Sequence, residues 1–325
     1  MPGTKELIPQ KRLKLFSGRS HLELARDIAG HLGVGLGDAN LSEFADGEIH
    51  CRFNESIRGS DVFIIQSHSD PVNKSIMEHL IMIDAAKRAS AKRVTAVCPY
   101  YGYSRQDRKS SGREPITAKL VADMLSTAGV DRVVSVDLHS GQIQGFFDVP
   151  VDHLTAMPIL TDYIQANFDN DVVIVSPDAG RVKLTERFAR HLDADLAIVH
   201  KRRVGSSSVE ALDVVGEVDG RVCVVVDDQI STAGTICAAA EQLVAHGASE
   251  VHAMATHGVF AGPAIDRIKN SMLSRVVVTD TLPLPDDRRI DKIEVLSVAR
   301  VIADALDAVF EDTSVSDIFG GENQS

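Results

Sequence analysis

The sequence RVCVVVDDQISTAGTI, residues 221–236, joins a short apolar run to two carboxylates and a turn of small residues. Residues 222–226 are apolar and mostly β-branched, and the run is too short to cross a membrane. It therefore predicts a buried strand of a parallel sheet. Asp227 and Asp228 come next, where we expect the strand to end and a ligand crevice to open.

The next segment has the composition of an anion-binding turn. It consists of Ser231, Thr232, Ala233, Gly234 and Thr235, and a helix pattern follows over residues 236–246. Unpaired backbone N–H groups at such a helix start suit a phosphate. A bare Asp-Asp pair more often ends a strand and caps a helix. The T-x-G-T element favours a functional role instead. In that role the carboxylates accept hydrogen bonds from sugar hydroxyls or bind a metal, and the turn binds a phosphate. The P-loop pattern G-x-x-x-x-G-K-[ST] is not the one present here.

Length and composition restrict the class of protein. The 325 residues predict two domains, and the 44% hydrophobic content is that of a globular protein. A formal net charge of −12 argues against general nucleic-acid binding. No signal-like apolar core or run of transmembrane length is seen, so we expect a cytoplasmic protein with no membrane partner. Cys98 and Cys223 lie in apolar strand patterns and are expected to be inert buried thiols.

Strand and helix patterns alternate along the chain, which predicts an α/β fold with two similar doubly wound domains, each built on a mainly parallel central sheet. The expected boundaries are 1–155 and 156–310, with a tail at 311–325. The expected strands are 13–16, 49–53, 62–66, 94–98, 132–136, 172–175, 196–199, 222–226, 251–256 and 276–279. The expected helices are 21–32, 73–88, one opened by Pro115, 158–168, 181–192, 236–246 and 298–310.

A second motif, PYYGYSRQDRK at residues 99–109, follows a predicted strand directly. It holds three of the four tyrosines, and cations gather in and after it at Arg105, Arg108, Lys109 and Arg113. Taken alone, the stretch is either a solvated charged loop or a polyphosphate site. Aromatic residues clustered against guanidinium groups favour a nucleotide.

Four further residues follow predicted strands. His139 ends one strand and is either structural or a ligand of metal or phosphate. Asp178 ends the corresponding strand of the second half and could share a metal with His139. Oxygen ligands with one imidazole suit magnesium better than zinc. Lys201 and Arg203 are either a surface charge run or a mobile loop that clamps transition-state charge.

Together these segments resemble the ribose-phosphate diphosphokinase family, whose members make phosphoribosyl diphosphate. The resemblance extends over about residues 13–319 in the family's order. The segments that carry it are FADGEIHCRFNESIRGSDVFIIQS, CPYYGYSRQDRK, VDLHSGQIQGFFDVPVDHL, VSPDAGRVK, HKRR and VVVDDQISTAGTI. It implies two type I phosphoribosyltransferase-like domains. It also implies transfer of the diphosphoryl group of magnesium ATP to the C1 hydroxyl of ribose 5-phosphate, with release of AMP.

The resemblance implies a role for each matching position. Lys201 and Arg203 match the catalytic flexible loop, and His139 and Asp178 match magnesium-associated positions. The ATP contacts would be Phe44, Asp46, Glu48, Arg105, Gln106 and His139, the first three acting on a neighbouring subunit's adenine. The ribose 5-phosphate contacts would be Arg203, Asp227, Asp228, Ser231, Thr232, Ala233, Gly234 and Thr235. A homohexamer built from dimers is implied as the assembly.

Regulation by phosphate or ADP is also implied. The matching positions are Ser56, Arg58, Arg113, Ser314, Ser316 and Phe319. Two positions depart from the pattern of many members: Ser231 stands where an aspartate is common, and Gly112 where a serine is common. Two other hypotheses remain at this stage, namely a non-catalytic regulatory homologue and a phosphoribosyltransferase that consumes phosphoribosyl diphosphate.

Overall fold

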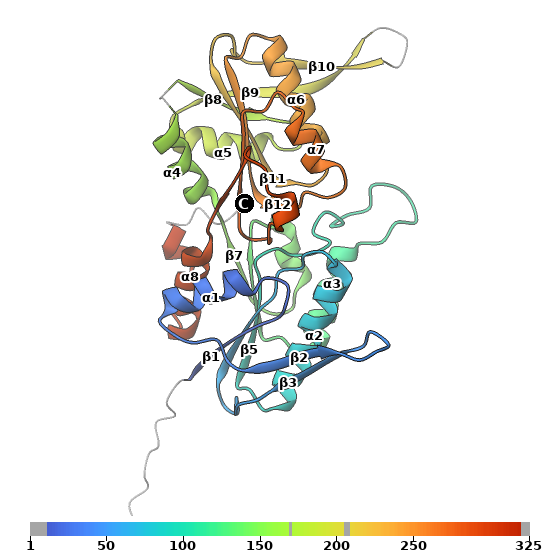
Figure 1. Ribbon diagram of the computed structural model, residues 1–325, viewed down its shortest axis with the longest axis vertical. Helices are drawn as coiled ribbons and strands as arrows, with labels where there is room; N and C mark the ends of the chain where they lie inside the picture. Colours follow the sequence, from blue (N-terminus) through green and yellow to red (C-terminus); the bar gives the residue numbers. More distant parts are fainter. Residues whose placement is uncertain (1–11, 169–170, 205–208, 320–325) are drawn as a thin grey trace, which may run out of the picture. The chain divides into compact units, whose positions relative to one another are not determined.

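A computed structural model describes residues 12–168, 171–204 and 209–319 of the chain (Figure 1). The chain divides into two compact units. The first contains the residues up to 135, residues 140–152 and those from 302 onward, whereas the second contains residues 136–139 and 153–301. Within the described ranges, no helix is long and apolar enough to cross a membrane.

The first unit is built on a five-stranded sheet in the order β1-β4-β5-β6-β7. Its strands are β1 (Leu13–Ser17), β4 (Asp61–Ile65), β5 (Arg93–Cys98), β6 (Arg132–Val136) and β7 (Val151–Leu154). The pairings β1–β4, β4–β5 and β5–β6 are all parallel. Its helices are α1 (Leu22–Leu32), α2 (Val72–Arg88) and α3 (Thr117–Ala128), with the 3-10 turns η1 (Gly141–Phe146) and η3 (Ser316–Phe319). The expected helices and parallel strands of this half are confirmed.

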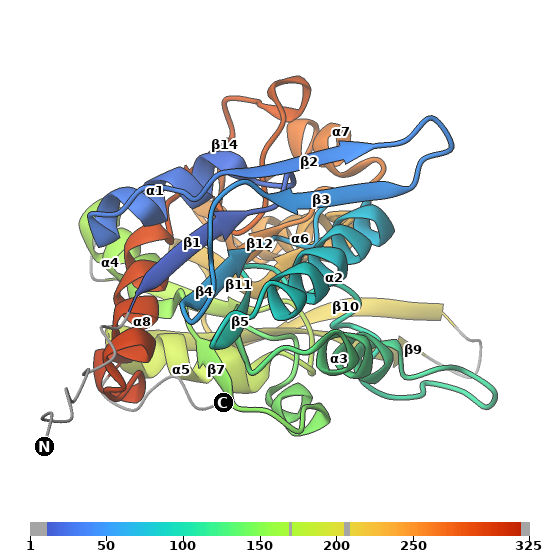
Figure 2. The same cartoon turned by 90° about the horizontal axis from the view of Figure 1, so that it is seen from below.

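A separate antiparallel hairpin, β2 (Ala39–Glu43) and β3 (Ile49–Phe53), belongs to the same unit (Figures 1 and 2). The sequence predicts β3 but not β2. The β2 residues are ANLSE, none of them β-branched, so the segment lacks the apolar run or alternation that marks a strand.

The second unit is built on a seven-stranded sheet in the order β10-β9-β8-β11-β12-β13-β14. The strands are β8 (Val172–Ser176), β9 (Asp195–Val204), β10 (Val209–Val215), β11 (Val222–Ile230), β12 (Glu250–Gly258), β13 (Arg275–Thr279) and β14 (Ile293–Leu296). All neighbours are parallel except β9 and β10. The helices are α4 (Met157–Asn167), α5 (Val182–Leu192), α6 (Gly234–Ala245) and α7 (Ala264–Lys269), with the 3-10 turn η2 (Asp286–Arg288). The C-terminal helix α8 (Ala299–Glu311) begins in this unit, but its residues from 302 onward belong to the first unit.

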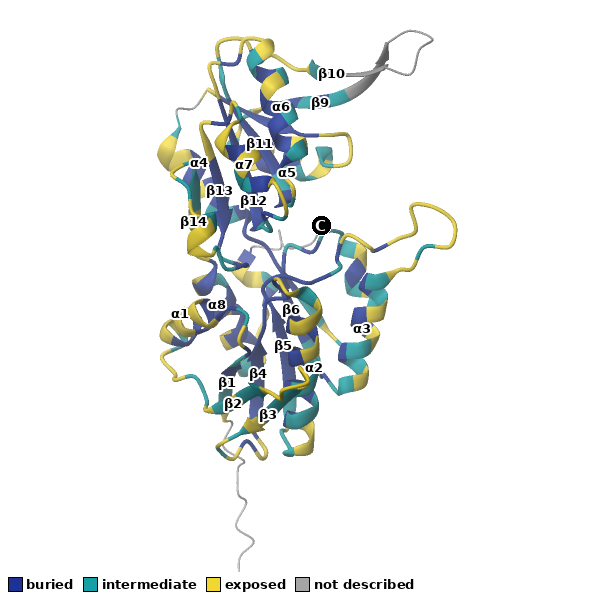
Figure 3. Ribbon diagram, turned by 45° about the vertical axis from the view of Figure 1, so that its right-hand side comes forward, coloured by how far each residue is buried: buried dark blue, intermediate teal, exposed yellow. Residues whose placement is uncertain are grey.

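Strand β11 lies in the middle of this sheet and is buried on both faces, as its continuous apolar run predicts (Figure 3). Val224 and Val226 pack on one face with residues of α4 and α5, such as Phe188. Cys223 and Val225 pack on the other face with α6. The strand order also reverses between β8 and β11, because the chain proceeds from β8 to one side and from β11 to the other. Such a switch point is where ligands of doubly wound sheets bind.

The predicted end of this strand is wrong. Strand β11 does not stop before the aspartates but continues through Asp227 and Asp228 to Ile230. The reason is asymmetric pairing: β8 follows β11 as far as Val225, whereas β12 stays paired with it to Ile230. The aspartates therefore lie on a strand that has lost one neighbour, and that side is open to other side chains.

Candidate functional site

The two aspartates of β11 are bound by one arginine and one histidine of the same unit. Arg181, at the start of α5, places Nε 2.9 Å from Oδ1 of Asp227 and Nη2 2.8 Å from Oδ1 of Asp228. His139 Nδ1 lies 2.7 Å from the other oxygen of Asp228. Arg181 Nη2 is also 2.9 Å from the His139 ring. The four side chains form one compact cluster at the switch point.

The pKa values of the two carboxyl groups are shifted in opposite directions. Burial raises the pKa of Asp227 well above its ordinary value, and the adjacent Asp228 raises it further. Burial also disfavours ionised Asp228, but hydrogen bonds from His139 and Asp227 and the charge of Arg181 outweigh it, so the pKa of Asp228 is lowered. Asp228 is therefore a firmly ionised acceptor, while Asp227 can hold a proton more easily.

The turn that carries His139 is held in place by hydrogen bonds to Asp137. Asp137 has a positive φ of 35°, and its carboxylate accepts hydrogen bonds from Thr256 Oγ1 at 2.6 Å and from the backbone N–H of Ala156 at 2.9 Å. His257 Nε2 lies 3.0 Å from the Asp137 carbonyl oxygen. Strand β12 thus holds the end of β6 so that His139 reaches the carboxylates of β11.

The turn between β11 and α6 has the form expected for a phosphate site. Ala233 precedes the helix in the left-handed conformation, with φ 59°. The helix then begins at Gly234, two residues earlier than the sequence predicts, and has no acidic residue in its first turn. Thr232 and Thr235 are exposed. Arg267 of α7 donates from Nη1 to the Thr232 carbonyl oxygen at 2.9 Å, so a cation lies beside the turn. Exposed N–H groups, hydroxyls and this guanidinium suit an anion.

Asp178 lies in the turn between β8 and α5 and is exposed. Its Oδ1 accepts the Gly180 N–H at 2.7 Å, and its carbonyl oxygen accepts the Ser176 hydroxyl at 2.7 Å. The contacts described for His139 are instead to Asp228, Arg181 and Gln229. Asp178 thus offers carboxylate oxygen to solvent, and His139 is engaged with the carboxylate of Asp228.

The expected loop at Lys201 and Arg203 is a strand in the structure, which corrects that prediction. Strand β9 continues to Val204 because β10 pairs with it antiparallel, Lys201 opposite Leu212 and Arg203 opposite Glu210. The side chains of these two cations lie outside the described residues.

In the first unit, the loop after β5 is held by its aromatic residues and presents its polar ones. Tyr101 is buried, and its hydroxyl donates to the Ala118 carbonyl oxygen at 2.9 Å. The Tyr103 hydroxyl donates to the Asn73 side chain. Arg105 and Gln106 are exposed. Tyr101 therefore anchors the loop from inside, whereas the sequence led us to expect the tyrosines to gather against the guanidinium groups.

The tip of the β2–β3 hairpin carries Phe44, Asp46 and Glu48. Phe44 has 57% of its surface exposed and makes an edge contact with the His50 ring, with 5.7 Å between centroids. The tip is closed by the Phe44 N–H bonded to the Glu48 carbonyl oxygen at 2.9 Å and by the Glu48 N–H bonded to Asp46 Oδ1 at 3.1 Å. A fully formed turn thus displays a large apolar ring to solvent.

The six positions expected for regulation lie on three segments of the first unit. Ser56 and Arg58 precede β4, Arg113 precedes α3, and Ser314, Ser316 and Phe319 follow α8. Ser56, Arg58 and Arg113 are exposed, and Phe319 is buried. Their use as one binding site stays a prediction.

Sequence reasoning missed Arg181 and Arg267. Arg181 directly follows the SPDAG turn, so its position at the mouth of the switch point was a usable signal. Arg267 lies on α7, a helix of six residues that is too short to show a clear helical pattern in the sequence. It reaches the turn before α6 only through a tertiary contact, its hydrogen bond to the Thr232 carbonyl oxygen.

Comparison with known proteins gives consistent matches over nearly all of the chain. Residues 13–129 match a model of the N-terminal domain of ribose phosphate pyrophosphokinase, and residues 203–320 match a phosphoribosyl synthetase-associated domain. The chain is 58% identical over 313 residues to the ribose-phosphate pyrophosphokinase of Streptomyces avermitilis, covering 95% of this chain and 97% of the relative. It is 54% identical over 307 residues to that of Bacillus cereus, covering 94% and 97%.

A solved structure agrees with these sequence matches. The phosphoribosylpyrophosphate synthetase of Mycobacterium smegmatis superposes with a TM-score of 0.89 at 50% identity. The match covers 93% of this chain and 100% of that one.

Proposed function

The chain belongs to the ribose-phosphate pyrophosphokinase family, and we propose that it transfers the β,γ-diphosphoryl group of ATP to the C1 hydroxyl of ribose 5-phosphate, giving phosphoribosyl diphosphate and AMP. The observation that carries this proposal is the acidic pair of β11 beside the phosphate-type turn that opens α6. In one chain, this sugar-phosphate site is combined with a separate loop of exposed Arg105 and Gln106 that suits a nucleotide.

The acceptor sugar is expected to bind along β11 and its turn. The 5-phosphate would accept hydrogen bonds from the backbone N–H groups and hydroxyls of residues 231–235, with Arg267 adding positive charge. Asp227 and Asp228 would accept hydrogen bonds from the ribose hydroxyls, and their firm support by Arg181 and His139 keeps the acceptor atoms fixed. Fixing both ends of the sugar orients its C1 hydroxyl for attack.

The donor nucleotide is expected to meet Arg105, Gln106 and His139, and the adenine to meet Phe44, Asp46 and Glu48 of a second copy of the chain. Diphosphoryl transfer needs alignment and compensation of charge more than covalent help from the protein. Lys201 and Arg203 would supply cations near the transferred group, in line with their place beside the sheet's carboxyl edge on β9.

Magnesium is the metal that the donor set favours. Asp178 offers an exposed carboxylate, an oxygen ligand of the type that magnesium prefers. When bound with the polyphosphate, the ion would neutralise part of its charge. Asp178 and His139 are the two residues that would hold it.

We also propose a homo-oligomer with at least a dimer as its unit, because the family resemblance assigns the exposed Phe44 of the hairpin tip to the adenine of a nucleotide held by a second copy. A hexamer built from dimers, regulation by phosphate or ADP at the six positions given above, and a cytoplasmic location are further proposals drawn from the family resemblance.

The reaction is tested by incubating the purified chain with ribose 5-phosphate, ATP and magnesium while following AMP. Release of AMP in step with phosphoribosyl diphosphate is expected, and no AMP at any phosphate concentration would contradict the proposal. Lys201→Ala is expected to lose most turnover while keeping substrate binding. A regulatory homologue would show no turnover in either form, and product analysis with added bases would reveal a phosphoribosyltransferase.

A further inference from the structure

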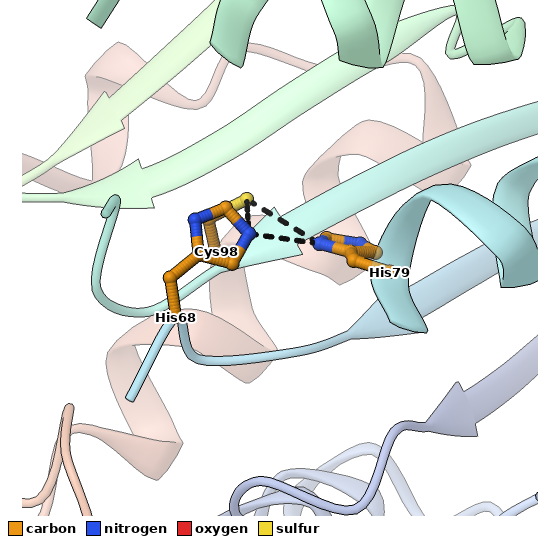
Figure 4. A group of neighbouring side chains, drawn as sticks. All are labelled: His68, His79 and Cys98. Carbon is orange, nitrogen blue, oxygen red and sulfur yellow. Dashed lines mark hydrogen bonds between the residues drawn. The ribbon is translucent and has the colours of Figure 1, made fainter. Parts of the chain in front are cut away.

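Three fully buried side chains of the first unit meet beneath the loop that follows β5 (Figure 4). His68 follows β4, His79 lies on α2 and Cys98 ends β5. His68 Nε2 is 3.2 Å from His79 Nδ1, and Cys98 Sγ is 3.9 Å from each of these nitrogens. Imidazole and thiolate are ligands of zinc and other transition metals, so a metal site is one possible use of this cluster.

The hydrogen bond on the far side of the His68 ring argues against a metal. The backbone N–H of Gly102 lies 3.0 Å from His68 Nδ1. Because a backbone N–H can only donate, Nδ1 must be the unprotonated nitrogen, and the ring proton lies on Nε2, facing His79 Nδ1. A metal-bound histidine normally keeps a proton on its other nitrogen and donates it. A metal on His68 Nε2 would therefore require a ring that has lost both protons.

Burial favours neutral rings and a protonated thiol. It lowers the pKa of His68 well below its ordinary value and that of His79 to about 4, and it raises the pKa of the Cys98 thiol. Near neutral pH both rings are neutral and the thiol keeps its proton. The result is a continuous chain of hydrogen bonds in which Gly102 donates to His68, and His68 donates to His79.

This chain ends at the base of the loop that presents Arg105 and Gln106. Gly102 packs so closely that an added Cβ would lie 2.9 Å from His68 Cβ and 3.2 Å from Ile76 Cδ1. The neighbouring Tyr101 hydroxyl is bonded to the Ala118 carbonyl oxygen. The base of the loop is therefore held by the Gly102–His68 hydrogen bond, by the His68 backbone N–H bonded to the Tyr100 carbonyl oxygen at 3.0 Å, and by the buried phenol of Tyr101.

We propose that His68, oriented by His79, is a positioning residue for nucleotide binding: its Nδ1 holds the Gly102 amide and so places the segment that carries Arg105 and Gln106. This inference rests on the proposed role of that segment in binding ATP. It assigns no chemical step to His68, which acts only through the loop.

The test compares His68→Leu, which removes the acceptor, with His68→Asn, whose side-chain oxygen can replace Nδ1. Loss of one buried hydrogen bond should raise KM for ATP about tenfold in the Leu variant, with much less change in KM for ribose 5-phosphate. Amide exchange at Gly102 should accelerate in the same variant. His68→Asn should restore both values toward those of the unaltered enzyme, and the matched core variant Cys98→Val should leave them unchanged.

Three results would overturn the inference. The first is an unchanged KM for ATP and unchanged Gly102 exchange in His68→Leu. The second is an equal rise in KM for both substrates, as a general packing defect would give. The third is stoichiometric zinc in the purified enzyme that is lost in Cys98→Val. If His68→Leu does not fold, His79→Leu and His79→Asn provide the same contrast, because Asn can again replace the accepting nitrogen.

Arg105→Ala separates this inference from the proposal on which it rests. If Arg105→Ala leaves KM for ATP unchanged, the nucleotide role of the loop is wrong. If Arg105→Ala raises KM for ATP but His68→Leu does not, the loop binds ATP and the positioning role of His68 is wrong.

Discussion

At the scale of single residues, Arg181 has the largest electrostatic task in the candidate site. It is the cation that compensates two adjacent, buried carboxylates. It also stands at the start of α5, where the helix dipole disfavours positive charge, so the aspartates in turn hold the arginine in place. Removing either the arginine or the aspartates would leave the remaining charge without its partner in a partly buried site.

Replacing Arg181 with Gln should weaken binding of ribose 5-phosphate. Without the guanidinium, the two carboxylates repel each other and take up protons more readily, so fewer firm acceptors face the ribose hydroxyls. KM for ribose 5-phosphate should rise about tenfold, equivalent to about 1.4 kcal/mol, with a smaller change for ATP. Steady-state kinetics with each substrate varied in turn will measure this split.

The matched control is Arg190→Gln, which removes the same charge from the far end of α5, where Arg190 pairs with Glu186 on an exposed face. It should leave both KM values unchanged. A lower KM for ribose 5-phosphate in Arg181→Gln would reverse the interpretation, because Arg181 would then obstruct the carboxylates rather than support them.

The buried His79 predicts a pH dependence of stability. Its pKa is lowered by burial from 6.5 to about 4 in the folded chain. As the pH falls below 6.5, the unfolded chain binds this proton first, so the free energy of unfolding should decrease between pH 6.5 and about 4. The loss from this one group is roughly 3 kcal/mol. Urea unfolding across this range should show a shallower slope with pH in His79→Leu, and an unaltered slope in the exposed-site control His31→Asn.

At the scale of elements, apolar runs predicted the central strands of both sheets, but they did not predict where β11 and β9 end, and they missed β7, β10 and β14. Strand β11 was found from residues 222–226, but its extension through the aspartates depends on β12, a partner remote in sequence. Strand β9 likewise continues into the cationic segment because β10 pairs with it. Strand ends are set by neighbours, so polar residues at an apparent strand end can still belong to the strand.

The candidate site divides in the same way. Asp227, Asp228 and the turn before α6 are contiguous in sequence, and their chemistry could be predicted from residue type and spacing. Arg181 and Arg267 reach them from α5 and α7 through tertiary contacts. The buried His68–His79 pair carried no sequence signal, since two isolated histidines gain meaning only from the 3.2 Å contact between their rings.

At the scale of the whole molecule, a single boundary cannot represent the units. Residues 136–139 group with the second unit and the residues from 302 onward with the first, so the chain passes between units more than once. The expected ranges 1–155 and 156–310 remain a prediction about folding domains. The segment at 136–139 is part of the proposed site, because it brings His139 to Asp228 within one unit.

Assembly gives the last prediction. If the exposed Phe44 serves the nucleotide of a second copy, each active site combines one chain's β9 and β11 with another chain's hairpin. Phe44→Ala and Lys201→Ala would each damage every site of their own homo-oligomer. In a mixed dimer, the Phe44→Ala chain has an intact Lys201 and receives an intact Phe44 from its partner, so one site of the two is whole. Random mixing makes about half of the dimers mixed, so the whole population should recover about a quarter of full activity, and the mixed dimers alone about half.

Co-expression of the two variants with different affinity tags, followed by tandem purification and the AMP-release assay, measures this recovery. Each variant purified alone gives the baseline, and a doubly substituted chain mixed with either single variant is the control that should gain nothing. Activity of the mixed oligomers no higher than the mean of the two variants would show that the hairpin serves its own chain. Recovery above that mean requires that Phe44 crosses to the neighbour, because no subunit in the mixture carries both side chains intact.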